Sequence, residues 1–157
     1  MKKIIFLVKL KQEGKLQRVE PSEEIQQSYL EKSESNLISA KILFNNNRLE
    51  ESVGLAYYSM YHLLTALFFK VGIKSENHSA SIILLKELFN LDNGDISKAK
   101  TERIDKQYYV DFKISREEVQ NTLRKAELFS GMMLDFISKT NYEQIKYYQE
   151  KFKELAE

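Results

Sequence analysis

Apolar residues recur along most of this chain at the three- and four-residue spacing of amphipathic helices, and the alternation typical of strands is rare. Strand-like patterns are confined to Ile4–Val8 and Tyr108–Ile114. The helical pattern predicts helices over six approximate ranges: Pro21–Asn46, Glu50–Val71, His78–Asn90, Ile96–Tyr109, a long one that begins near Ser115, and 141–156. Four to six helices joined by short links predict an all-α, antiparallel up-and-down helical bundle.

The expected helix ends carry residues with known capping behaviour. Gly72 can adopt the left-handed conformation that closes a helix, and asparagines in the run Asn45–Asn47 can do the same. Pro21 suits the first turn of a helix. Two capping boxes, Ser115–Glu118 and Thr140–Glu143, are expected to start the last two helices.

The segment Ala56–Val71 is apolar or aromatic almost all the way round its predicted helix. Such a helix must be buried on every side. Because a bundle of this size can cover two of its three faces, we expect a second subunit to cover the third and the protein to be a homodimer. The third face is the most polar one and carries Tyr58, His62 and Thr65.

Composition narrows the class of protein. The chain has 157 residues, 43% of them apolar, which is enough for one domain with a substantial core. We expect a single helical domain over 21–157, preceded by a basic segment over 1–20. That segment is either a short docked helix or strand, or an arm that approaches nucleic acid. The net charge of +1 provides no general attraction to nucleic acid.

The sequence favours a cytoplasmic protein without metal or cofactor. It contains no cysteine, which suits a reducing compartment. The apolar run Ile4–Val8 is shorter than that of a signal peptide, and nothing approaches the roughly 18 apolar residues of a membrane span. No histidine and carboxylate share a helix face at ligand spacing, and no glycine-rich phosphate loop is visible.

Three positions are candidates for chemistry. His62 is either a core histidine whose nitrogens find partners or a group lining a cleft where a base stacks on Tyr58. His78 lies at a helix start beside Lys74, where free N–H groups can bind an anion, although a simple N-cap explains the same composition. Arg103 lies on a helix with few apolar positions and either pairs with a nearby carboxylate or clamps a phosphate.

Three segments together carry a family resemblance: AYYSMYH at Ala56–His62, GIKSENHS at Gly72–Ser79 and RIDKQYYVDF at Arg103–Phe112. In combination they resemble the HEPN domain, a nucleotide-binding domain of higher eukaryotes and prokaryotes, and in particular its small prokaryotic branch. The resemblance extends over about Gly14–Ile137. It implies a helical bundle that dimerises, with its functional groove near the dimer interface.

The resemblance also implies a range of functions. Many HEPN proteins are ribonuclease toxins or bind nucleotide or RNA, and many are encoded beside a minimal nucleotidyltransferase that acts as antitoxin. The ribonuclease members use an arginine and a histidine separated by four to six residues. At that spacing after Arg103 the chain has Tyr108, Tyr109 and Val110, so the motif is not intact. The catalytic residues are therefore unknown, and enzymatic activity is left open.

We therefore expect a HEPN-type protein that binds nucleotide or RNA, in a toxin–antitoxin-like pair with a nucleotidyltransferase. The alternatives are a metal-independent ribonuclease that uses Arg103 with His62 or His78, and a non-catalytic protein-interaction module. The expected binding residues are Tyr58, His62, Lys74, His78, Arg103 and Tyr108.

Overall fold

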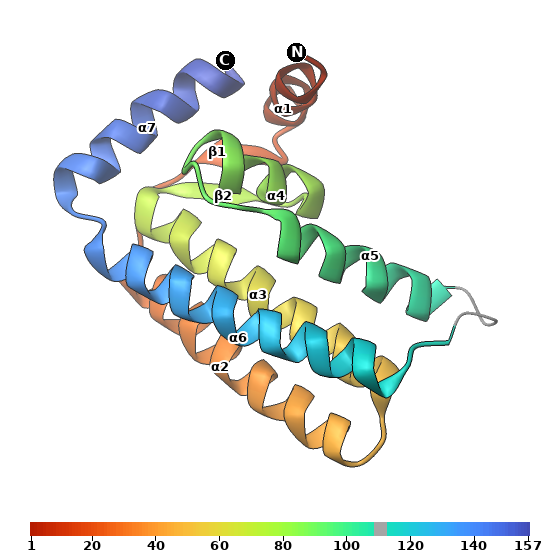
Figure 1. Ribbon diagram of the computed structural model, residues 1–157. Coiled ribbons are helices and arrows are strands. Elements are labelled where there is room, and N and C mark those ends of the chain that lie inside the picture. Colours follow the sequence, from red (N-terminus) through yellow and green to blue (C-terminus); the bar gives the residue numbers. More distant parts are fainter. Residues whose placement is uncertain (109–112) are drawn as a thin grey trace.

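Helices form almost the whole of the fold, as Figure 1 shows. The computed structural model describes the backbone of residues 1–108 and 113–157, and the side chains of these residues except 104–108. The elements are α1 (Lys2–Gln12), β1 (Leu16–Arg18), α2 (Glu23–Asn45), α3 (Leu49–Val71), β2 (Ile73–Ser75), α4 (His78–Glu87), α5 (Gly94–Tyr108), α6 (Arg116–Lys139) and α7 (Tyr142–Ala156).

The predicted all-α class is confirmed, and the helices α2, α3 and α6 run up and down beside one another (Figure 1). The described residues contain seven helices where four to six were expected, because the N-terminal segment also forms a helix. Helix α3 lies at the centre and packs against α2, α5 and α6. It therefore presents side chains to several neighbours at once.

The three faces of helix α3 differ in how far a single chain covers them. Two of its faces are buried, and the face with Tyr58, His62 and Thr65 is half-buried. The bundle therefore buries two faces of α3, through its contacts with α2, α5 and α6, and leaves the third partly open, as the sequence predicts. That a second subunit covers the third face in a homodimer stays a prediction.

The helix ends follow the expected residues in most places. Gly72 ends α3 with φ +92°, and a Cβ at this position would lie 2.6 Å from the backbone oxygen of Val19. Asn47 has φ +62° just after α2, and Ser115 accepts a hydrogen bond from the backbone of Glu118. Each of these positions thus uses the conformation or the side chain that the sequence suggested.

Two predicted helix starts are wrong, the first by two residues and the second by one. Ser22, not Pro21, is adjacent to the first turn of α2, and its hydroxyl accepts from the Ile25 N–H at 3.1 Å. The last capping box is formed by Asn141 and Gln144 in place of Thr140–Glu143. Threonine and asparagine are both good N-caps, so their order of preference cannot fix the boundary.

The N-terminal segment forms part of the fold. Of the alternatives for this segment, the docked helix is the one formed: Ile4–Val8, in spite of its strand-like pattern, lies in α1, which buries Leu7 and Leu10 and packs against α7. The strands β1 and β2, which the sequence did not reveal, pair antiparallel with Gln17 opposite Lys74. The other predicted strand, 108–114, falls mostly outside the described residues. This small sheet connects the end of α3 to the start of α4, where His78 lies.

Candidate functional site

The motif AYYSMYH places four aromatic side chains on two adjacent faces of α3. Tyr57 and Tyr61 are one helical turn apart, with ring centroids 6.0 Å apart. Tyr58 and His62 form a second pair on the next face, also 6.0 Å apart. The four-residue spacing produces both pairs, because residues i and i+4 lie one above the other on a helix.

His78 reaches the first of these faces from the start of α4. Gly72 and β2 turn the chain back, and the Asn77 side chain caps α4 by accepting from the Ala80 N–H at 2.9 Å. The His78 ring then stacks on Tyr61 with centroids 3.8 Å apart and planes inclined by 14°. The hydroxyl of Tyr57 lies 2.7 Å from His78 Nδ1. These two contacts fix the imidazole in both position and orientation.

Arg103 joins the same group from α5. Its Nη1 donates to the Tyr58 hydroxyl at 2.9 Å. The guanidinium carbon lies 5.3 Å from the ring centre of Tyr57 and 5.1 Å from that of Tyr58, within the range of cation–π attraction. One turn earlier on α5, the Lys100 ammonium donates to the Ser79 hydroxyl at 2.9 Å. Two cations of α5 therefore border the aromatic side chains of α3 and α4.

We call this group the aromatic–basic cluster. It consists of Tyr57, Tyr58, Tyr61, His62, His78 and Arg103.

The electrostatic environment of the cluster is positive. Burial, together with the charge of Lys32 and the proximity of His78, lowers the pKa of His62 to about 4. Burial also lowers the pKa of His78, with Arg103 and Lys100 adding to the effect. Both imidazoles are therefore neutral at pH 7. Among the described side chains, the charged groups that shift these two pKa values are all cations, which favours an anionic ligand.

Two further features concern protons in the cluster. Burial raises the pKa of the Tyr57 and Tyr61 hydroxyls, so both stay protonated at neutral pH. The Nδ1 atom of His62 is buried and has no hydrogen-bond partner among the described residues. A nitrogen in such surroundings is costly to protonate, in agreement with the direction of the pKa shift.

The structure brings together four of the six binding residues expected from the sequence: Tyr58, His62, His78 and Arg103. Lys74 is exposed on β2 and forms an ion pair with Glu76 at 3.5 Å. The side chain of Tyr108 lies outside the described residues.

Sequence reasoning missed Tyr57 and Tyr61 as partners of His78, and it missed Lys100. It assigned both tyrosines to a core face, and their i, i+4 spacing could have indicated a pair. Arg103 does not depend on its neighbour Glu102 for a partner, because Glu102 accepts a hydrogen bond from Thr122 at 2.6 Å and Arg103 bonds Tyr58.

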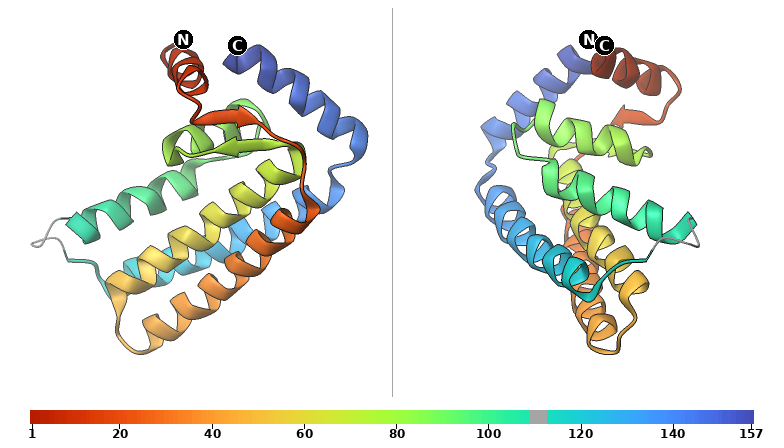
Figure 2. Two further views of the ribbon diagram at one scale, coloured as in Figure 1. Left: turned by 180° about the vertical axis from the view of Figure 1, so that it is seen from behind. Right: turned by 45° about the vertical axis from the view of Figure 1, so that its right-hand side comes forward.

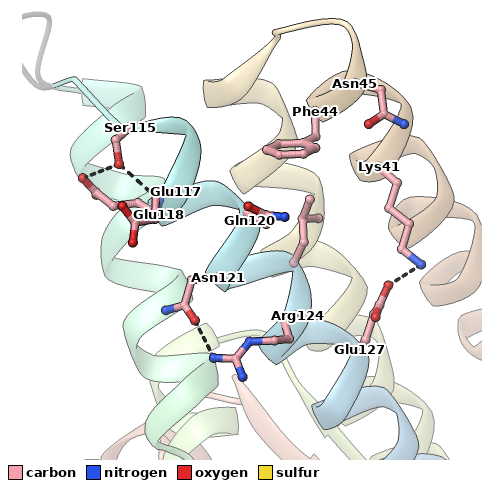
Figure 3. A pocket seen from close by; sticks show the side chains of 11 residues that line it. Lys41, Phe44, Asn45, Ser115, Glu117, Glu118, Gln120, Asn121, Arg124 and Glu127 are labelled. Atoms are coloured by element: carbon pink, nitrogen blue, oxygen red, sulfur yellow. Dashed lines mark hydrogen bonds and ion pairs between the residues drawn. The ribbon is translucent and has the colours of Figure 1, made fainter.

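A large hollow of the described surface lies elsewhere, between α2 and α6 (Figure 3). It has a volume of about 950 Å³ and shares no residue with the aromatic–basic cluster. Two of its cations have partners within the hollow, since Lys41 forms an ion pair with Glu127 and Arg124 donates to Asn121 at 2.8 Å. Its mixed charges indicate no particular ligand.

Two other kinds of site receive no support from the part of the chain that is described. No group of three or more histidine, aspartate or glutamate side chains there could hold a metal ion. None of the described helices combines the length and apolar character needed to cross a membrane.

Comparison with known proteins identifies the family. The model of the HEPN domain matches residues 26–155, so the chain belongs to the HEPN domain family. A protein of Methanocaldococcus jannaschii named "Putative toxin MJ0605" is 32% identical over 114 residues, which cover 68% of this chain and 84% of that protein. A second protein of that organism, "Putative toxin MJ0142", is 25% identical over 71% of this chain and 81% of its own length.

A shorter match comes from Pyrococcus horikoshii. Its "UPF0332 protein PH1297" is 38% identical over 56 residues, which cover 36% of this chain and 39% of that protein.

Proposed function

We propose that this HEPN protein binds RNA or a nucleotide at the aromatic–basic cluster and acts as the toxin-like member of a pair with a minimal nucleotidyltransferase. The observation that carries the binding proposal is the position of Arg103, held on Tyr58 at 2.9 Å next to two neutral histidines. The relatives' names support the toxin-like role.

Each part of a nucleotide finds a matching group in the cluster. The planar fork of Arg103 suits the two oxygens of a phosphate, and Lys100 adds a second positive charge. The half-buried ring of Tyr58 offers a surface on which a base can stack. A neutral His78 can donate or accept a hydrogen bond without repelling the cations beside it.

RNA binding is tested with Arg103→Gln, which removes the charge and keeps much of the side-chain volume. We expect the affinity for single-stranded RNA to fall about tenfold or more, because charge-assisted contacts to phosphate are lost. Arg124→Gln on α6 is the matched control, since Arg124 is exposed and bonds Asn121 of its own helix. Equal affinity of the two variants would exclude the cluster as the site, and the interaction-module alternative would then take precedence.

Arg103→Gln is also expected to lower the melting temperature slightly. The substitution leaves the Tyr58 hydroxyl without its donor and removes the cation from two tyrosine rings. The binding measurement is therefore made well below the melting temperature of the variant.

The toxin-like role is tested in bacterial cells. We expect controlled expression of the protein to slow growth, and co-expression of a nucleotidyltransferase encoded beside it to restore growth and to co-purify with it. His78→Ala and Arg103→Gln should relieve the growth defect if the cluster carries the activity. The proposal places the protein in the cytoplasm as a homodimer. Sedimentation at micromolar concentration tests the homodimer directly.

A second candidate function is metal-independent RNA cleavage. The observation in its favour is that the fold brings Arg103 close to His78 through Tyr57, although the two are not at motif spacing in the sequence. A neutral His78 can serve as a general base at pH 7 when Nδ1 carries the proton and donates it to the Tyr57 hydroxyl, because Nε2 is then free to accept a proton. Cleavage of RNA in the presence of a chelator, lost in both His78→Ala and Arg103→Gln, would establish this function. Binding without cleavage would favour the non-catalytic proposal.

A further inference from the structure

Two further rings, Tyr29 and Phe69, extend the aromatic–basic cluster beyond His62. The ring centroid of Tyr29, a residue of α2, lies 5.5 Å from that of His62. Tyr29 also stacks on Phe69, with ring centroids 6.1 Å apart and planes inclined by 5°. The rings of Phe69, Tyr29, His62 and Tyr58 therefore follow one another in contact, and all four are half-buried.

The rings of the row come from α2 and α3, and α5 contributes the cation beside Tyr58. On the side of the bundle away from α6, α3 lies between α2 and α5, as the left view of Figure 2 shows. At the α5 end, the guanidinium carbon of Arg103 lies 5.1 Å from the centre of the Tyr58 ring. At the α2 end, the exposed Lys32 has its ammonium 5.8 Å from the centre of the Tyr29 ring. The part of the row from Tyr58 to Tyr29 thus has a cation at each end, and the two cations come from different helices.

An exposed tyrosine with a lysine one turn away is by itself ordinary. Tyr142 and Lys146 on α7 form such a pair, with the ammonium 4.5 Å from the ring centre, and no further ring contact joins Tyr142 among the described residues. The Tyr29–Lys32 pair differs because His62 links it to Tyr58, which Arg103 contacts. This continuity indicates a single extended surface.

We propose that Tyr29 and Lys32 form a second nucleotide subsite, so that the ligand of this protein is a single RNA strand that spans at least two nucleotides. One base stacks at Tyr58, with its phosphate at Arg103, and the neighbouring base stacks at Tyr29, with its phosphate near Lys32. The inference rests on the proposed binding function and extends it to a substrate class.

The chemistry of the row selects a single strand over a duplex or a free mononucleotide. Aromatic rings flanked by cations commonly bind single strands, because every base can stack on a ring and every phosphate carries a negative charge. In a duplex the base faces are occupied by neighbouring pairs and cannot reach the rings. A mononucleotide fills one subsite and leaves the other empty. Stacking on rings reads no base edges, so binding is expected to tolerate different sequences.

The test compares two probes: adenosine monophosphate and a short oligoadenylate with 2′-O-methyl groups that prevent cleavage. For the unmodified protein we expect the oligoadenylate to bind at least about tenfold more tightly than the monophosphate. Tyr29→Ala should lower the oligoadenylate affinity about tenfold and leave the monophosphate affinity unchanged. Tyr29→Phe, which keeps the ring, should retain the affinity for both probes.

Two variants serve as matched controls. Tyr142→Ala removes a tyrosine of α7 that also has a lysine over its ring, and it should leave both affinities unchanged.

The second test variant is Lys32→Gln, which should reduce the slope of log affinity against log salt for the oligoadenylate by about one. Lys41→Gln makes the same charge change on the face of α2 that contacts Glu127, and the slope should stay the same. Since Lys32 is exposed, its variant folds even if Tyr29→Ala does not.

The outcomes separate this inference from the function on which it rests. If neither probe binds the unmodified protein, the proposed function fails and the subsite fails with it. If both probes bind and Tyr29→Ala and Lys32→Gln leave the oligoadenylate affinity and salt slope unchanged, only the second subsite is refuted. An equal loss for both probes in Tyr29→Ala also refutes it, because Tyr29 would then belong to the first nucleotide.

Discussion

The hydroxyl of Tyr57 lies 2.7 Å from Nδ1 of His78, and this contact determines which nitrogen of the imidazole is left for a ligand. Burial raises the pKa of Tyr57 and lowers that of His78, so at neutral pH the hydroxyl keeps its proton and the imidazole is neutral. The hydroxyl can then donate to Nδ1, in which case Nε2 carries the ring proton. His78 would thus offer an N–H donor to a phosphate.

We expect nitrogen NMR of the unmodified protein at pH 7 to show His78 with its proton on Nε2. In Tyr57→Phe the Nδ1 partner is lost, so the two neutral forms should become more evenly populated. Tyr61→Phe is the control, because it removes a hydroxyl that lies 3.1 Å from Ser81 and keeps the ring stacked on His78. A proton on Nδ1 in the unmodified protein would show that the hydroxyl accepts from His78 instead.

The pKa of His62 predicts a loss of stability in mild acid. The folded protein holds this pKa at about 4, below the ordinary 6.5, so the unfolded chain binds a proton that the folded one does not. The free energy of unfolding should therefore rise with pH between about 4 and 6.5 and fall as the pH is lowered through that range. Denaturant titrations at pH 7 and pH 5 measure the difference.

His62→Phe keeps a ring beside Tyr29 and Tyr58 and removes the titrating group. Its loss of stability between pH 7 and pH 5 should be smaller than that of the unmodified protein. The pKa of His78 is lowered as well, so some pH dependence should remain. If the variant and the unmodified protein lose the same free energy, His62 does not titrate in the way its surroundings indicate.

The α6 helix offers a direct test of the core. Leu123 and Phe129 are 6% and 4% exposed, so Leu123→Ala and Phe129→Ala should each lower the free energy of unfolding by about 2–5 kcal/mol. Leu128, on the same helix, is 63% exposed. Leu128→Ala should change the free energy of unfolding by no more than about 0.5 kcal/mol. Urea denaturation of the three variants should separate them clearly. Similar midpoints would mean that α6 faces the core differently.

Gly72 is required for the turn that brings His78 to the cluster. Gly72→Ala should lower the free energy of unfolding by at least about 1 kcal/mol, because φ is +92° and the new Cβ would meet the Val19 oxygen at 2.6 Å. Gly131→Ala in α6 is the contrasting control. No described atom beyond its own helix and chain neighbours lies within 4 Å, so alanine there should stabilise by roughly 0.5–1 kcal/mol. Thermal melts of both variants give the comparison, and a stabilised Gly72→Ala would contradict this account.

The sequence by itself determined the helical class, most helix boundaries and the position of three chemically important residues. These features follow from local physics: the 3.6-residue period places apolar residues on one face, Gly72 and Asn47 accept positive φ, and Ser115 caps α6. His62 and His78 were found because they are the only histidines, and Arg103 because it matches the family resemblance and lies on a helix of low apolar content.

Only the tertiary structure decided how these residues meet. Tyr57 and His78 are 21 positions apart and Arg103 and Tyr58 are 45 apart, and no periodic pattern reports a contact between separate helices. The pairing of β1 with β2 escaped prediction because strands of three residues carry too little pattern. The cover of α3 and the row from Tyr58 to Tyr29 likewise depend on how α2 and α5 pack, which is set by the whole core and not by any one segment.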